Sequence, residues 1–295
     1  MCDIKAVGPG VWNGWKGELL RNLFSAAEPH LSSGYNEANH QTQVNQNLQK
    51  FKSLMQDVQS EQLDALIERH YASYWVKVDL DSQIHHSKMI LEDAGHILDT
   101  IKYAIQVDSF KAITEVTIYT PDHANLLCYI AKACAHVNAN ILDAQIFTTK
   151  DGYAIDTILL KQEFNTDEDE ERRANSIIKT LSKLLKGEII EEAELHKIDR
   201  LSKRKKAFNV EEIVTISNDL SDHFTVIECE AIDRAALLYK ITTAIKELNL
   251  NISSAHISTF GEKAVDCFYV TDYTGDKITC HKRQAKIINH IKEIL

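Results

Sequence analysis

The sequence DHANLL at residues 122–127 returns as DRAALL at residues 233–238, so an Asp-x-Ala-x-Leu-Leu phrase occurs twice at an offset of 111 residues. Each copy follows a β-branched run, ITEVTIY (113–119) or FTVIECEA (224–231), and precedes an amphipathic run with helical spacing. Two further strand-like runs and a second amphipathic run complete each half. The duplicated phrase therefore predicts two copies of one α+β module.

The repeat extends beyond the phrase itself. At the same offset the matched pairs are Ile130/Ile241, Asn138/Asn249, Asn140/Asn251, Ile141/Ile252, Ala144/Ala255 and Ile146/Ile257. After the next hairpin Asp156 matches Asp266, so the offset falls to 110 and one residue has been lost in a turn. The last strand of the first copy is expected in GEIIEEAEL (187–195). The second copy has no such run after its final helix, so EEIVTIS (211–217) is expected to contribute an upstream strand.

The residues before the repeats differ in character. VGPGVWNGW (7–15) breaks any regular element, and the pattern from 41 to 101 is mainly helical, with Ile97, Leu98 and Ile101 continuing one helical stripe. YASYWVKVDL (71–80) is aromatic and β-branched, which is typical of a short strand. We predict a terminal segment over 1–35, a helical connector over 36–110, the first module with its basic linker KIDRLSKRKKAFN over 111–210, and the second module over 211–295.

Composition excludes several classes of protein. The 295 residues and 44% hydrophobic content suit about two compact domains, and the net charge of −10 disfavours nucleic-acid binding. The sequence contains no run of about 18 apolar residues and no signal-like segment, so a cytoplasmic protein that does not enter the membrane is expected. The six cysteines form no C-x-x-C pair and are expected to be reduced and mostly buried.

The duplicated phrase admits a structural and a functional interpretation. Asp122 and Asp233 are candidate N-caps, since an Asp before a helix accepts hydrogen bonds from its free N–H groups, and the Leu pairs would anchor the helix to the sheet. The same N–H groups can instead bind a carboxylate ligand. Asn138 and Asn249 are expected as left-handed residues that end the helix. Asn140 and Asn251 can serve a turn, or can bond an amino or carboxyl group beside the loop.

This pattern resembles the ACT domain, a ferredoxin-like βαββαβ module that typically senses amino acids at an interface between paired domains. The helix-opening phrase of that family resembles Asp-Arg-Pro-Gly-Leu-Leu, whereas this chain has Ala124 and Asn125 or Ala235 and Ala236 in place of Pro-Gly. A Cβ at the glycine position can crowd a ligand. By resemblance, the ligand-binding residues are Asp122, Asn125, Leu126 and Asn140 in one copy and Asp233, Ala236, Leu237 and Asn251 in the other.

Longer blocks resemble one family over essentially the whole chain: AVGPGVWNGWKGELLRNLF, RHYASYW, NANILDAQIFTTKDGYAIDT, AFNVEEIVTISND and LNISSAHISTFGEKAVDCFYVTD. They are similar, in order and spacing, to the bifunctional PII uridylyltransferase/uridylyl-removing enzymes. The resemblance implies a nucleotidyltransferase domain, an HD phosphohydrolase domain and two ACT domains in the intact enzyme. It also implies transfer of UMP from UTP to a tyrosine of PII, hydrolytic removal, and control by glutamine sensed at the ACT pair.

The catalytic motifs of that family are missing from this sequence. The Gly-Ser and spaced aspartates that hold Mg²⁺ and UTP have no counterpart, and Asp79 and Asp81 are expected to serve a turn or a helix cap. The resemblance implies that residues 1–35 are the C-terminal remnant of the HD phosphohydrolase domain. Asp3 resembles the last metal-binding aspartate of that domain, but one carboxylate cannot build a divalent-metal site. His85 and His86 are expected at the surface. The chain alone is therefore predicted to be inactive and to need no cofactor.

Three hypotheses remain open. The first is the C-terminal regulatory part of such an enzyme, as a fragment or as the product of a truncated gene, which binds glutamine and acts on PII signalling. The second is an ACT-type interaction module that self-associates and no longer binds an amino acid. The third is residual catalysis together with a separately encoded catalytic half.

Overall fold

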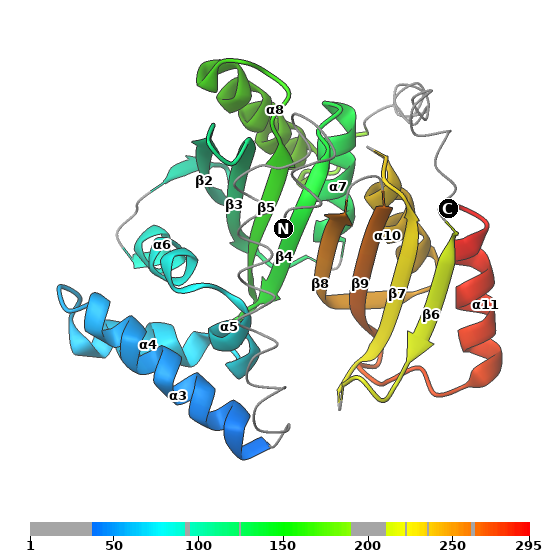
Figure 1. The fold of residues 1–295 in the computed structure, drawn as a ribbon, viewed down its shortest axis with the longest axis horizontal. Coiled ribbons are helices and arrows are strands. Elements are labelled where there is room, and N and C mark those ends of the chain that lie inside the picture. The colour runs from blue at the N-terminus through cyan, green and yellow to red at the C-terminus, as the bar shows by residue number, and fades with distance from the viewer. Residues whose placement is uncertain are drawn as a thin grey trace, which may run out of the picture.

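The computed structural model describes residues 37–91, 95–123, 125–189, 211–221, 223–234, 236–260 and 263–295 (Figure 1). The segment 1–35 with Asp3, the basic linker, and most of the GEIIEEAEL strand predicted for the first module lie outside these residues. Among the described helices, none combines the length and apolar character needed to cross a membrane.

One antiparallel sheet runs through both modules. Its nine strands lie in the order β1-β2-β3-β5-β4-β8-β9-β7-β6. The modules join where β4 pairs with β8, with Ala144 opposite Ile257. The strands are β1 (His96–Leu98), β2 (Ile101–Asp108), β3 (Ile113–Pro121), β4 (Ile141–Thr148), β5 (Tyr153–Lys161), β6 (Ile213–Ser217), β7 (Thr225–Ile232), β8 (Leu250–Phe260) and β9 (Lys263–Asp272).

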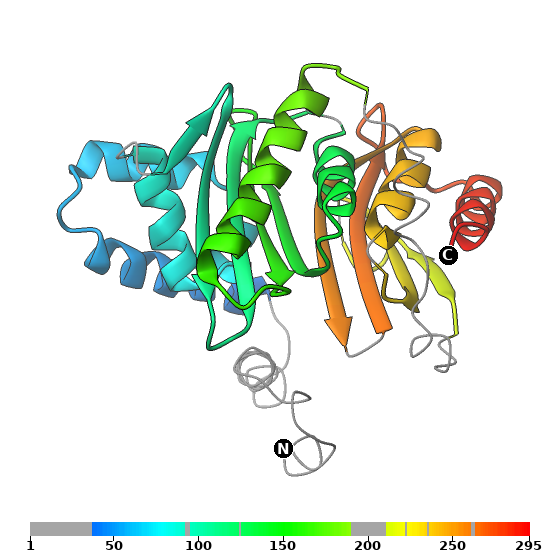
Figure 2. The same ribbon diagram turned by 90° about the horizontal axis from the view of Figure 1, so that it is seen from above.

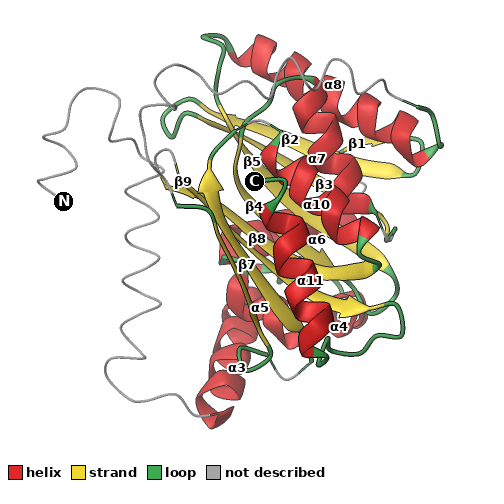
Figure 3. Cartoon of the chain, turned by 90° about the vertical axis from the view of Figure 1, so that its right-hand side faces the viewer, coloured by secondary structure: helices red, strands yellow, loops and turns green. Residues whose placement is uncertain are grey.

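Four helices cover one face of this sheet (Figure 3). They are α7 (Leu126–His136), α8 (Asp167–Leu185), α10 (Leu237–Glu247) and α11 (His281–Lys292). Their apolar faces share one continuous core with the strands of both modules, which includes the repeat-equivalent pair Ile130 and Ile241, both fully buried. Burial of this shared surface is the main force that holds the modules together. The predicted α+β fold class with a preceding helical segment is confirmed.

The edge strand of each module comes from upstream in the chain. β6 lies within EEIVTIS and pairs with β7, as expected, and β2 takes the same place beside β3 in the first module, where β1 adds one more strand to the sheet. The prediction that Ile97, Leu98 and Ile101 continue a helix is wrong, because these residues lie in β1 and β2. A short apolar run fits either period, and hydrogen bonding to β3 decides between them.

Four helices of the connector cover the opposite face of the first module (Figure 2). They are α3 (Glu37–Leu54), α4 (Ser60–Arg69), α5 (Ala72–Lys77) and α6 (Leu80–Leu91). The strand predicted in YASYWVKVDL is wrong: the segment forms α5, whose Tyr74 and Trp75 are 2% exposed and pack with Phe147 and Ile155 of the sheet. Tertiary packing has overridden the local β-propensity.

Buried polar contacts fix this docking. His86, expected at the surface, is 2% exposed, and its two ring nitrogens lie 2.9 Å from Tyr74 Oη and 2.9 Å from Thr157 Oγ1 of β5. Burial lowers the pKa of His86 to about 3, so the ring is neutral. Asp79 caps α6 by accepting a 2.9 Å bond from the Ser82 backbone N–H, in agreement with its predicted capping role.

Five cysteines lie in the described residues as free thiols, of which Cys267 is half-buried. Cys128, Cys134 and Cys229 are free and buried, whereas Cys280 is free and exposed.

Candidate functional site

The seam between the modules contains two pockets that approximately repeat one another. Each is built from the loop that opens one module's helix, the strands of that module and the adjoining strand of the other. The repeat-equivalent pairs that line both are Asp122/Asp233, Leu126/Leu237, Leu127/Leu238, Ile146/Ile257, Thr148/Thr259, Ala154/Ala264, Asp156/Asp266 and, from the opposite module, Ile252/Ile141. Residues at equivalent positions of the sequence repeat therefore line equivalent walls of the two pockets.

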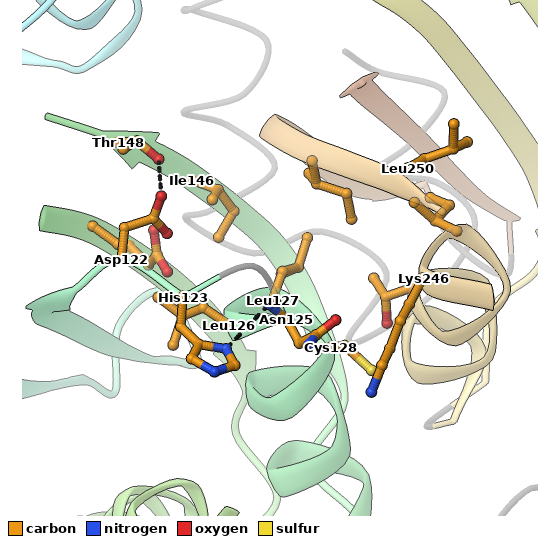
Figure 4. A pocket seen from close by; sticks show the side chains of 15 residues that line it. Asp122, His123, Asn125, Leu126, Leu127, Cys128, Ile146, Thr148, Lys246 and Leu250 are labelled. Atoms are coloured by element: carbon orange, nitrogen blue, oxygen red, sulfur yellow. Dashed lines mark hydrogen bonds between the residues drawn. The ribbon is translucent and has the colours of Figure 1, made fainter. Parts of the chain in front are cut away.

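The first pocket is the larger of the two, and Figure 4 shows its lining residues. It has about 30 Å³ of enclosed space and about 450 Å³ when its open mouth is included. Asp122 follows β3 and accepts a long 3.3 Å bond from Thr148 Oγ1. Lys246, from α10 of the other module, lines the opposite wall, so groups of both charges contribute to the pocket.

The second pocket is smaller, with about 20 Å³ of enclosed space. Here Asn140 Nδ2 donates a 2.9 Å hydrogen bond to Asp233 Oδ2. The repeat equivalent of Lys246 is Ala135, which is fully buried, so no lysine reaches this pocket from the opposite helix. Arg234 donates to the backbone carbonyls of Ile294, at 3.0 Å, and Leu295.

Each pocket contains a second, buried carboxylate. Asp156 on β5 is 0% exposed and Asp266 on β9 is 1% exposed. Burial raises the pKa of Asp156 well above its usual range, and the charge of Asp122 raises it further. The Phe147 backbone N–H lies close enough to oppose this shift, but forms no hydrogen bond of normal geometry. Burial, followed by the charge of Asp233, raises the pKa of Asp266 to about 8.

The two aspartates of the repeated phrase do not occupy the predicted N-cap positions. The helices begin at Leu126 and Leu237, and their N-cap positions are Asn125 and Ala236, neither with a capping side-chain bond. The Leu126 backbone N–H instead closes a turn on the His123 carbonyl at 2.7 Å, which delays the helix beyond the aspartate. Asp122 and Asp233 are thereby left to face the pockets.

The structure distributes the predicted ligand residues differently from the sequence repeat. Asp122, Asn125 and Leu126 line the first pocket, and Asp233 and Leu237 line the second. Asn140, from the first module, lies in the second pocket beside Asp233. Asn251 is half-buried on β8 between Leu250 and Ile252, which both line the first pocket. Ala236 is 2% exposed and packs against Ala135 of the other module.

The helix-ending asparagines behave as predicted. Asn138 and Asn249 have φ values of 52° and 57°, which is the left-handed conformation that Asn tolerates after a helix.

The sequence analysis did not identify Asp156, Asp266 or Lys246 as ligand-binding candidates. Asp156 and Asp266 carried a usable signal, because each is a matched acid inside an otherwise apolar strand. Lys246 carried none, since its role depends on which helix faces the loop. Among the described residues there is no group of three or more His, Cys, Asp or Glu side chains that could hold a metal ion.

Comparisons with known proteins agree with this architecture. Residues 220–295 match the model of the ACR family N-terminal ACT domain, so an ACT domain is present. The whole chain is 46% identical to the bifunctional uridylyltransferase/uridylyl-removing enzymes of Bradyrhizobium sp. strain ORS 278 and Rhodopseudomonas palustris strain CGA009. It covers 32% of each, so it spans about a third of the length of these relatives. The similarity falls on their C-terminal part.

Among solved structures, the aspartate kinase from Synechocystis is similar over 63% of this chain, with a TM-score of 0.37 and 16% identity.

Proposed function

We propose that this chain is the glutamine-sensing regulatory part of a bifunctional uridylyltransferase/uridylyl-removing enzyme. The supporting observation is the charge composition of the first pocket, which Asp122 and Asp156 of one module and Lys246 of the other line together. Lys246 Nζ lies 5.7 Å from the centre of the Tyr129 ring. An amino acid is a zwitterion, so its carboxylate pairs with Lys246 while its ammonium group pairs with the acids of the loop side.

A ligand held in this way bridges the two modules. Because it contacts both sides of the seam, it stabilises one relative arrangement of β4, β8, α7 and α10 over others. Such differential affinity is what a regulatory ligand requires. The connector lies on the far face of the same β5 strand, with Thr157 bonded to His86 directly beyond Asp156. A shift at the seam can therefore reach the connector and the catalytic part of an intact enzyme.

Calorimetry on the purified chain tests this proposal. Glutamine is expected to bind at up to millimolar concentration and glutamate to bind more weakly, because the extra carboxylate of glutamate adds negative charge beside Asp122. Lys246→Met should weaken glutamine binding by roughly 1.5–3 kcal/mol, the range for a hydrogen bond to a charged group. An absence of heat at millimolar glutamine, with the chain folded by circular dichroism, would remove the sensing role.

The catalytic role of the relatives does not transfer to this chain alone, which lacks the Gly-Ser and His-Asp motifs. We expect no labelling of PII from UTP by the purified chain. Labelling that appears only after addition of a separately produced catalytic half would instead identify a split enzyme.

One observation favours a second candidate, a module that associates without binding an amino acid. In the second pocket the Asn140 amide already bonds Asp233, so that pocket needs no ligand. If both pockets behave in this way, ultracentrifugation should show self-association that glutamine does not change. A strictly monomeric chain that binds glutamine would exclude this candidate.

A further inference from the structure

The fold does not explain Asp156 and Asp266, because strands packed beneath helices need only apolar side chains at these positions. Both lie on the helix-covered face of the sheet, at the base of a pocket, and both are almost completely buried. In the described part of the chain, neither oxygen of Asp156 has a hydrogen-bond partner, and Oδ1 of Asp266 has none either. A buried polar group without a partner is costly, so this arrangement needs a ligand or a functional reason.

The chemistry of the first pocket restricts what that ligand is. When ionised, Asp156 presents acceptors only, as Asp122 does, and among the described residues the Asp122 side chain accepts one 3.3 Å bond, from Thr148. The missing partner is therefore a cation that brings its own hydrogen-bond donors. A bare divalent ion needs more ligands than these two acids, and the described residues contain no larger cluster. A primary ammonium group has three donors, and about 30 Å³ of enclosed space admits one or two water-sized groups.

In the second pocket, a side chain of the protein makes the same kind of contact, an N–H donor bonded to the loop aspartate. Asn140 extends its Nδ2 donor from the opposite module and bonds Asp233 at 2.9 Å, beside the buried Asp266. This side chain supplies to Asp233 an N–H donor of a kind that no described residue supplies to Asp122. Among the described residues, the Asp122 side chain accepts its bond from the Thr148 hydroxyl, and the repeat-equivalent Asn251 does not line the first pocket.

We propose that Asp156 is a ligand-binding and specificity-determining residue of the first pocket, where it and Asp122 bind the ammonium group of an amino acid. This inference rests on the proposed function for the class of ligand. It extends that function by assigning the ammonium group to a residue outside the repeated loop, and by assigning the second pocket to Asn140 instead of a ligand.

Ligand binding in this arrangement is coupled to a proton. The titratable groups around Asp156 are Asp122 and His123 from the loop, Cys128 from α7 and Lys246 from α10, while β4 contributes apolar Ile146 and the Thr148 hydroxyl. Burial, followed by the charge of Asp122, raises the pKa of Asp156, which favours its protonated form in the empty pocket. The arriving ammonium group already carries its own proton, so Asp156 ionises and releases one proton to solvent. Affinity should therefore rise with pH while the amino group of the ligand stays protonated.

Isothermal titration calorimetry with L-glutamine and N-acetyl-L-glutamine, in two buffers of different ionisation enthalpy, measures affinity and proton release together. Asp156→Asn should weaken glutamine by about tenfold or more and abolish proton release, since a charge-assisted contact is lost. Asp143→Asn is the matched control: burial raises the pKa of Asp143 to about 7, but its side chain bonds Ser258 and does not line the pocket. Asp143→Asn and Asp266→Asn should each change affinity by no more than about twofold.

The outcomes separate the two proposals. Glutamine binding that N-acetylation and Asp156→Asn abolish, with both control variants unaffected, supports the inference. Glutamine binding that is insensitive to Asp156→Asn overturns it and leaves glutamine sensing intact. A third outcome is that glutamine does not bind but another amino acid raises the melting temperature of the chain in a thermal-shift panel. If Asp156→Asn removes that increase, glutamine sensing is wrong and the ammonium site is supported. No response to any amino acid overturns both.

Discussion

In the first pocket Asp122 faces an open cavity with a lysine on its far wall, whereas in the second pocket Asp233 is bonded to the Asn140 amide and no lysine is present. The pockets share their repeated residues and differ at the positions that come from the opposite module. Duplication has therefore preserved the loop and strand positions of both pockets. The residues from the opposite module determine whether the loop aspartate faces a cavity or is bonded to a side chain of the chain itself.

The outer faces of the two modules differ as well. β5 is buried continuously from Ala154 to Leu160, because helices cover both of its faces. β9 alternates between half-buried and buried residues, as a strand covered on one face does. The described connector helices are therefore docked chiefly on the first module. Four predictions test these contrasts, from the largest expected effect to the smallest.

Tyr74→Ala tests how much the packing of the connector helices on the first module contributes to stability. Tyr74 is 2% exposed, contacts Phe147 and is bonded to His86, so truncation leaves a cavity and a buried unpaired imidazole. We expect a loss of about 3–5 kcal/mol in the free energy of unfolding, measured by urea denaturation. Tyr273→Ala, at a position 61% exposed in the second module, is the control and should cost under about 0.5 kcal/mol. Equal losses would mean that the connector is not docked as described.

Asp266→Asn tests whether the second buried acid is neutral in the folded chain. The folded pKa of about 8 lies above the usual aspartate value of 3.8, so the folded state holds more protons than the unfolded state between these values. The stability contributed by this group is thus fully present below about pH 4 and is lost as pH rises toward 8, at no more than about 1.4 kcal/mol per pH unit.

The variant should remove that loss. Between pH 6 and pH 8 the wild-type chain should lose about 2 kcal/mol more than Asp266→Asn in urea unfolding. Asp64→Asn, which alters an exposed acid paired with Lys52, is the control. The same pH dependence in Asp266→Asn and in the wild type would show that Asp266 is ionised throughout.

Much of this arrangement could be predicted from the sequence, and the failures have physical causes. The repeat located both loops and both left-handed asparagines, because these depend on local backbone geometry. It could not show that Asn140 meets Asp233, since that contact depends on how β4 and β8 pair across the seam. The wrong strand prediction over α5 has a related cause: its aromatic residues are buried against another element, and burial outweighs propensity in so short a segment.

Asn140→Ala should make the second pocket resemble the first. Removal of the amide donor leaves Asp233 without this bond and costs about 1.5 kcal/mol, the lower end for a hydrogen bond to a charged group. It also clears the pocket beside Asp266, so a second glutamine molecule should bind per chain in calorimetry, more weakly than the first because no lysine lines this pocket. Asn251→Ala, at the repeat-equivalent position, should cost under about 0.5 kcal/mol and leave the stoichiometry at one. An unchanged stoichiometry in Asn140→Ala would show that Asn140 is not what closes the second pocket.

Lys77→Met tests the contact that links the connector to the second module. Lys77 Nζ lies 4.6 Å from the centre of the Tyr269 ring on β9, and burial lowers the pKa of this lysine. Met retains the apolar stem but removes the cation, so the loss should be about 0.5–1 kcal/mol. Lys150→Met removes a longer contact of 5.6 Å with Tyr71, which does not involve the second module, and should cost less. A double-mutant cycle with Tyr269→Leu isolates the pair, and a coupling energy near zero would show that the connector is energetically coupled to the first module but not, through this contact, to the second.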